Sequence, residues 1–128
     1  MPTLAETAVS RFDDHFNCSQ SVFAAFAPQY GVQEALALKI ASPFGGGMAR
    51  QGHVCGAVSG ALMALGLARG ATTPAGKEKA YQLGEEFIQR FEAWPAGSAP
   101  GRTLCWTTWP GSRSCSGPAN STGRLKAR

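Results

Sequence analysis

Cys18 and Cys55 are the residues of this sequence best suited to chemistry. Cys18 follows Asn17, a good N-cap residue, and Cys55 is predicted in the first turn of a helix from about residue 53 to 68. The positive end of a helix dipole lowers the pKa of a thiol, and a thiolate is both a nucleophile and a metal ligand. Two such cysteines on adjacent helix starts predict either a reversible disulfide or thiolates that hold a metal ion or an iron–sulfur cluster.

Small residues follow Cys55 on one face of the predicted helix. Gly56, Ser59 and Gly60 leave this face almost free of side chains. Glycine inside a helix costs up to ~1 kcal/mol relative to alanine, so it usually has a packing or functional reason. We therefore expect another backbone, or a ligand, to come close to the helix here.

A glycine-rich loop, Gly45-Gly46-Gly47, comes before the Cys55 helix. Such a loop forms tight turns and exposes N–H groups, which suits a chain segment beside a reactive sulfur. It is not a phosphate loop, because no Gly-Lys-Ser/Thr follows it. His53 stands two residues before Cys55 and is a candidate to tune the thiolate or to bind metal with it. A plain flexible turn and a solvated histidine are the alternatives.

Helical periodicity runs through the first 93 residues and period-two alternation is absent. The predicted helices cover about residues 3–15, from 18 to a stop at Pro28 and Gly31, 33–41, 53–68 and 74–93. In the third of these, Val32, Leu36 and Ile40 lie on one side. We expect an all-α fold, a compact bundle of about five helices with the glycine loop before the fourth. The phenylalanines are expected in its core.

Residues 94–128 differ in composition and show no periodicity. They hold all three tryptophans, Cys105 and Cys115, and much Gly, Pro, Ser, Thr and Arg. We interpret them as an irregular, disordered tail after a domain formed by residues 1–93. A second hypothesis is translation out of frame from near Ala93, because the offset frame over 104–117 permits an amphipathic helix.

Charge and hydropathy restrict the class of protein. Residues 1–93 carry seven Lys/Arg and eight Asp/Glu, whereas residues 94–128 carry five Lys/Arg and no acid. Because residues 1–93 are nearly neutral, they lack the positive charge that is typical of nucleic-acid-binding domains. The uncharged stretch 54–68 is shorter than the ~20 residues that cross a bilayer, and no signal peptide is evident at the N-terminus. We expect a cytoplasmic protein without a membrane span.

Three motifs together resemble a known family: residues 16–20 (Phe-Asn-Cys-Ser-Gln), 44–48 (Phe-Gly-Gly-Gly-Met) and 55–63, which contains Cys-Gly-Ala-x-x-Gly. They are similar to the redox-active proteins named for a C-GCAxxG-C-C pattern, over about residues 10–92. The resemblance implies a small helical protein with four cysteines, often encoded beside transporter genes. It assigns Cys18 and Cys55 to the first two cysteines of the pattern, and Gly56, Ala57 and Gly60 to the rest of the hallmark.

The resemblance weakens toward the C-terminus. Relatives continue with a helical region that bears a Cys-Arg pair and a last cysteine, so their roles are not transferred to Cys105 and Cys115. Three functions remain open: a thiol redox protein working through Cys18 and Cys55, a metal or iron–sulfur module, and a helical interaction domain with inert cysteines. A redox partner protein or a transporter-associated system is the expected partner. The sequence contains no catalytic triad, no paired carboxylates in a suitable context and no dinucleotide-binding fingerprint. It therefore leaves open whether the protein is an enzyme.

Overall fold

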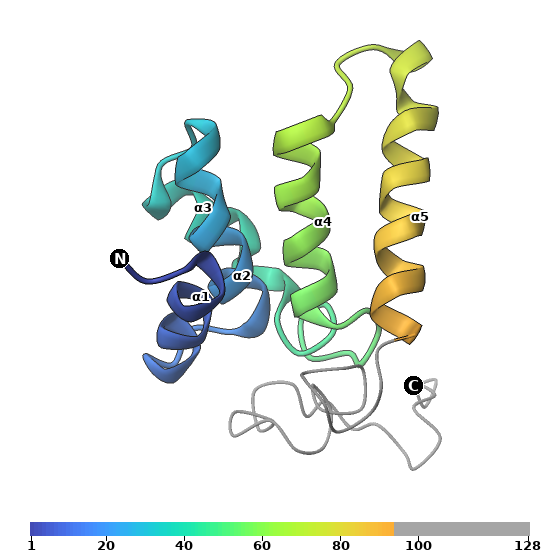
Figure 1. Cartoon of the computed structure of the whole chain (residues 1–128). Helices are drawn as coiled ribbons and strands as arrows, with labels where there is room; N and C mark the ends of the chain where they lie inside the picture. The colour runs from blue at the N-terminus through green and yellow to red at the C-terminus, as the bar shows by residue number, and fades with distance from the viewer. Residues whose placement is uncertain (94–128) are drawn as a thin grey trace.

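The computed structural model describes residues 1–93, and within this range every regular element is helical (Figure 1). The elements in chain order are α1 (Leu4–Asp13), α2 (Cys18–Phe26), η1 (Ala27–Tyr30), α3 (Glu34–Ala41), η2 (Ser42–Phe44), α4 (Gly56–Arg69), η3 (Pro74–Gly76) and α5 (Lys77–Ala93), where η marks a 3₁₀ turn. The predicted all-α fold of five helices is confirmed. The predictions for residues 94–128, the disordered tail and the shifted frame, lie outside the described residues.

Capping boxes start the first two helices. Thr3 accepts a hydrogen bond from the N–H of Glu6, whose carboxylate accepts one from the N–H of Thr3. Asn17 and Gln20 form the same reciprocal pair at the start of α2. Each box satisfies two backbone donors that a helix start otherwise leaves unpaired. The sequence therefore predicted correctly that Asn17 caps a helix opening at Cys18.

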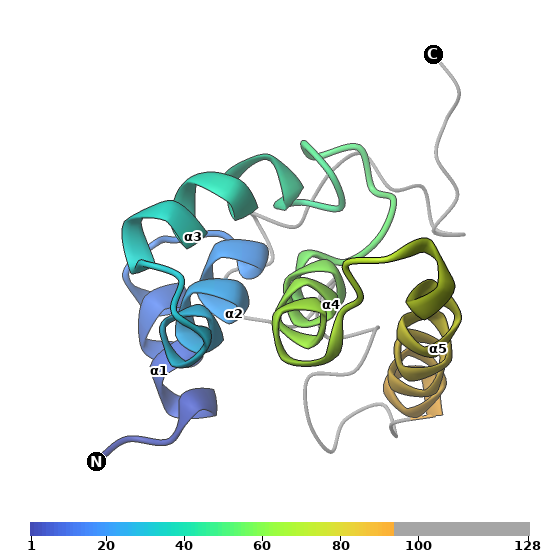
Figure 2. The same ribbon diagram turned by 90° about the horizontal axis from the view of Figure 1, so that it is seen from above.

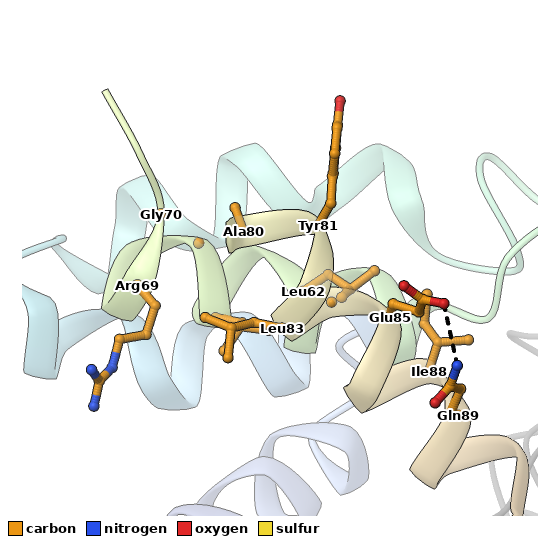
Figure 3. A pocket seen from close by; sticks show the side chains of 12 residues that line it. Leu62, Arg69, Gly70, Ala80, Tyr81, Leu83, Glu85, Ile88 and Gln89 are labelled. Carbon is orange, nitrogen blue, oxygen red and sulfur yellow. Dashed lines mark hydrogen bonds between the residues drawn. The ribbon is translucent and has the colours of Figure 1, made fainter. Parts of the chain in front are cut away.

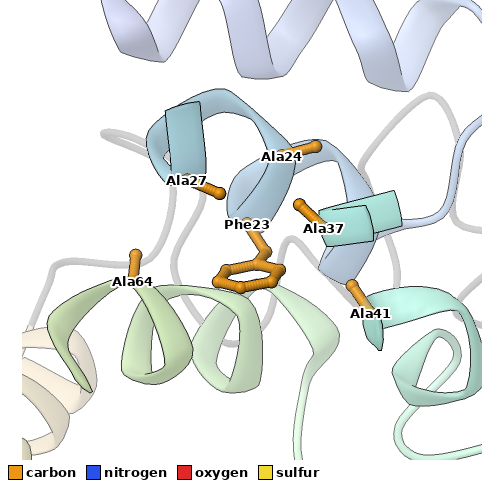
Figure 4. Packing of buried hydrophobic residues seen from close by; sticks show 6 residues of the cluster. All are labelled: Phe23, Ala24, Ala27, Ala37, Ala41 and Ala64. Atoms are coloured by element: carbon orange, nitrogen blue, oxygen red, sulfur yellow. The ribbon is translucent and has the colours of Figure 1, made fainter. Parts of the chain in front are cut away.

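Helix α2 lies at the centre of the described bundle. It packs against α1, α3 and α4, while α5 lies on the far side of α4 (Figures 1 and 2). The core around α2 has one large side chain, Phe23, which is 3% exposed. Alanines from α2, η1, α3 and α4 surround its ring (Figure 4). The small alanine side chains let these helices approach closely, and Phe23 fills the space between them.

The side of α3 that carries Leu36 and Ile40 is not its buried face. Leu36 is 51% exposed and Ile40 is 45% exposed, whereas Ala37 and Ala41 are buried against α2. A large side chain buries more apolar area than a methyl group, so size alone would favour Leu36 and Ile40 for the core. Instead, Ala37 and Ala41 take the buried positions of α3, and Leu38 packs against the same cluster as a partly buried side chain.

An ion pair joins α1 to the start of α3. Arg11 donates a hydrogen bond to the Glu34 carboxylate across the surface. This hydrogen bond holds the pKa of Glu34 below its usual value. The pair fixes the position of α1 beside α3, although exposed ion pairs contribute only ~0.2–1 kcal/mol to stability.

Within residues 1–93, no helix combines the length and the apolar character that crossing a bilayer requires.

Candidate redox site at the starts of α2 and α4

The two cysteines lie in one buried cluster although they are distant in the sequence. Cys18 is the first residue of α2 and Cys55 is the residue directly before α4. Each is 6% exposed, and Val58 is buried with them. The crossing of α2 over α4 thus brings two sulfur-bearing side chains to the same end of the bundle.

Gly56 provides the closest approach between the two helix starts. A Cβ atom built on Gly56 would overlap the Sγ atom of Cys18 and would lie 2.9 Å from the backbone N of Ser19. One turn further, a Cβ atom on Gly60 would lie 2.8 Å from the carbonyl oxygen of Ser19. The small face of α4 is therefore occupied by the backbone of α2, one of the two neighbours that the sequence left open. Gly66 has nothing within 4 Å of a built Cβ and takes no part in this contact.

The N-terminal end of α2 is attached to α3 and η2 by side-chain hydrogen bonds. Asn17 donates from Nδ2 to the carbonyl oxygen of Ser42, at 2.9 Å. Gln20 donates from Nε2 to the carbonyl oxygen of Leu38, at 3.0 Å. The same two residues form the capping box, so Cys18 stands between two anchored side chains.

Cys55 occupies the N-cap position of α4. Its carbonyl oxygen accepts hydrogen bonds from the N–H groups of Val58 and Ser59, at 2.9 and 3.0 Å. The predicted helix start near His53 is wrong by about one turn, because the N–H of His53 donates to Gly47 in the preceding loop. Cys55 still lies at the positive end of the helix, where the helix dipole stabilises negative charge.

The loop before Cys55 contains an unusual backbone conformation. Residues 46–50 all have positive φ, between +53° and +73°, and three of them, Met48, Ala49 and Arg50, are not glycine. A non-glycine residue in the left-handed region costs roughly 1–2 kcal/mol. The loop therefore stores conformational strain next to the cysteine cluster, and such strain is typical of functional sites.

Backbone hydrogen bonds inside the loop maintain this conformation. The N–H groups of residues 50–53 donate to loop carbonyls, including Arg50 to Gly45 at 3.0 Å and His53 to Gly47 at 2.9 Å, and those of Met48 and Ala49 donate to carbonyls of η2. The N–H groups of residues 48–53 are therefore not available to a sulfur atom. The buried glycines instead allow close packing, with Gly45 against the side chain of Asn17 and Gly47 against His53 and Gly52.

Ala49→Gly should stabilise the protein by about 1 kcal/mol, because glycine adopts positive φ without the steric cost that alanine has there. Urea denaturation measures the change in unfolding free energy. Ala35→Gly is the matched control, since Ala35 is exposed in a helix and the same substitution there should destabilise by about 0.5–1 kcal/mol. Equal losses at both positions would show that residue 49 is not left-handed in solution.

Aromatic side chains from two other helices form the apolar wall of the cysteine cluster. Phe12 of α1 and Phe87 and Phe91 of α5 pack against it, the last two with ring centroids 6.2 Å apart. The sequence placed these phenylalanines in a general core but not beside the cysteines. No local motif links them to Cys18 or Cys55, because only the tertiary arrangement brings α1 and α5 to this end of the bundle.

The remaining predicted site residues lie around the cluster. Ala57 is partly buried and packs on it, whereas the side chain of His53 is exposed. Among residues 1–93, no group of three or more His, Cys, Asp or Glu side chains is arranged to hold a metal ion. The described part of the chain therefore brings two cysteines into one apolar cluster, and a metal site here would need ligands from elsewhere.

These features define a class: a small all-helical protein with two buried cysteines at helix N-termini and a strained glycine loop beside them. The sequence profile of the family described as "putative redox-active protein (C_GCAxxG_C_C)" matches residues 16–123. The chain belongs to this family. The match extends past the region in which the three motifs lie and includes Cys105 and Cys115, which are outside the described residues. No curated protein and no solved structure matches the chain.

Proposed function

We propose that the protein is a thiol–disulfide redox protein in which Cys18 and Cys55 form the reactive pair. The observation that supports this most is their shared burial in one apolar cluster, at the starts of two helices in direct contact. Membership of a redox-active family supports the same class of function. A neutral disulfide needs no hydration, so an apolar cluster suits the oxidised form of such a pair.

The proposed reaction is an exchange with a disulfide on a partner protein. One cysteine thiolate attacks a sulfur atom of the partner disulfide, forms a mixed disulfide and releases the first partner thiolate, which takes up a proton. The second cysteine, once deprotonated, attacks the mixed disulfide and releases the second partner thiolate. The partner disulfide is reduced to two thiols while Cys18 and Cys55 are oxidised to one disulfide, so two electrons and two protons are transferred.

Access to the sulfur atoms must come from the loop side. Val54, next to Cys55, is 42% exposed, and His53 before it is also exposed. The other sides of the cluster are covered by the phenylalanines of α1 and α5. In the proposed exchange, a partner protein therefore approaches the cysteine pair from the side of the loop.

The metal and interaction-domain alternatives have less support. A closed zinc or iron–sulfur site takes four protein ligands, and the described residues bring only two thiolates into the cluster. Inert cysteines would leave unexplained why a strained loop and a glycine contact surround them.

Titration in graded thiol–disulfide buffers, with thiol trapping and intact mass spectrometry, tests the proposal. The wild-type chain should show a reversible two-electron couple that is lost in Cys18→Ser and in Cys55→Ser. Cys105→Ser and Cys115→Ser test the pairing itself: a couple between Cys18 and Cys55 is retained in both variants. Because serine leaves a buried hydroxyl group, Cys18→Ala and Cys55→Ala provide a second set of variants.

Three outcomes would contradict the proposal. A couple that survives in both Cys18 variants and disappears in a Cys105 or Cys115 variant would assign the reaction to another pair. Stoichiometric metal in the purified protein, with unfolding on chelation, would favour the metal module. If the chain showed neither a redox couple nor bound metal, the helical interaction domain would be the remaining function.

A further inference from the structure

An apolar groove runs between α4 and α5. It has a volume of 510 Å³ and lies between two antiparallel helices (Figures 1 and 3). Its large apolar lining residues are Leu62, Leu65, Tyr81, Leu83 and Ile88. Tyr81 is 66% exposed and Ile88 is 37% exposed, so this apolar surface is open to solvent.

Helix α5 lacks the burial expected of a helix with an apolar stripe. None of its described side chains reaches full burial, and its main helical neighbour within residues 1–93 is α4. A helix usually buries one face against a second layer. The α4–α5 hairpin thus presents an incomplete layer, and a further pair of helices would complete it.

The charged residues that line the groove are placed so that the grooves of two copies are complementary in charge. Arg69 and Glu85 are its two charged lining residues, and they lie toward opposite ends of it (Figure 3). Neither forms an ion pair with another described residue. A two-fold axis through the groove places the Arg69 end of one copy over the Glu85 end of the other, so the same pair of opposite charges meets twice.

We propose that a second copy of this chain covers the groove. Two α4–α5 hairpins then pack face to face as a four-helix arrangement, with the leucines and Ile88 inside and the Arg69–Glu85 pairs at the rim. The groove shares Leu62 with the residues packed against the cysteine cluster but contains neither cysteine, so the inference does not depend on the redox proposal. Residues 94–128 of the same chain and an unrelated protein are the competing occupants.

Sedimentation velocity over a concentration series, with reductant present to exclude intermolecular disulfides, tests the pairing. The full chain should approach twice its 13.4 kDa as concentration rises. Ile88→Glu should weaken the dimer at least tenfold, because it places a carboxylate in the apolar contact. Ile40→Glu is the matched control and should leave the dimer unchanged, since Ile40 is 45% exposed on α3, outside the groove.

A charge exchange makes the test specific for orientation. Arg69→Glu should weaken the dimer, and adding Glu85→Arg to the same chain should restore it. Circular dichroism melts of each variant show that it is folded. A wild-type chain that remains monomeric at every concentration, or a dimer that Ile88→Glu and Arg69→Glu leave intact, would overturn the proposal; protection of the groove in a monomer would assign it to residues 94–128.

Discussion

Gly56→Ala should destabilise the protein by about 3 kcal/mol, the upper part of the range for overpacking a tight contact. The new methyl group would overlap Sγ of Cys18 and press on the backbone of Ser19 at 2.9 Å and of Phe44 at 3.2 Å. A side chain can rotate away from such an overlap, but the backbone atoms of Ser19 and Phe44 can move only if α2 and η2 shift away from α4. Urea denaturation of wild type and variant measures the loss.

Gly66→Ala is the matched control in the same helix. No atom lies within 4 Å of a Cβ built on Gly66, so the substitution should stabilise the protein by about 0.5–1 kcal/mol through helix propensity alone. Opposite signs at the two positions would establish that α2 contacts α4 through Gly56. Equal stabilisation at both would contradict the helix crossing described here.

Phe23→Ala should cost about 3–5 kcal/mol, which is a large part of the stability of a domain of this size. Phe23 is the one large buried side chain among the alanines of the first core cluster. Alanine side chains cannot extend into the space that the ring leaves, so the cavity persists in the variant. Thermal and urea denaturation should both show the loss.

Leu36→Ala provides the comparison for Phe23→Ala. Leu36 is 51% exposed on α3, so its truncation should change the stability by no more than about 0.5 kcal/mol. A large loss of unfolding free energy in Leu36→Ala, with a small loss in Phe23→Ala, would indicate that Leu36 and not Phe23 lies in the core. It would contradict the packing of α3 through Ala37 and Ala41.

Local signals in the sequence predicted much of the fold correctly. Asn17 followed by Gln20 marks a helix start through chemistry confined to four residues, and the structure has the helix there. Apolar spacing predicted five helices, and the spacing of Gly56 and Gly60 predicted a close approach to α4. These signals work because each depends on neighbours within one or two helical turns.

Features set by contacts between distant segments were not predictable in this way. The start of α4 depends on the hydrogen bond from His53 back to Gly47, and the left-handed loop includes three residues that ordinarily avoid positive φ. The buried face of α3 depends on how closely α2 approaches it. The aromatic wall around the cysteines likewise depends on where α1 and α5 lie in space.

The anchoring of Asn17 and Gln20 to α3 and η2 makes the two sides of the cysteine pair mechanically unequal. Cys18 is carried on a rigid support, because its helix start is tied to Ser42 and Leu38 through side chains. Cys55 follows a strained loop whose hydrogen bonds, within residues 1–93, are to its own carbonyls and to those of η2, with no side-chain hydrogen bond of this kind, so it is carried on the more compliant support. A change in the separation of the two sulfur atoms during an oxidation cycle would therefore displace the loop and the first turn of α4, while α2 would act as the fixed frame.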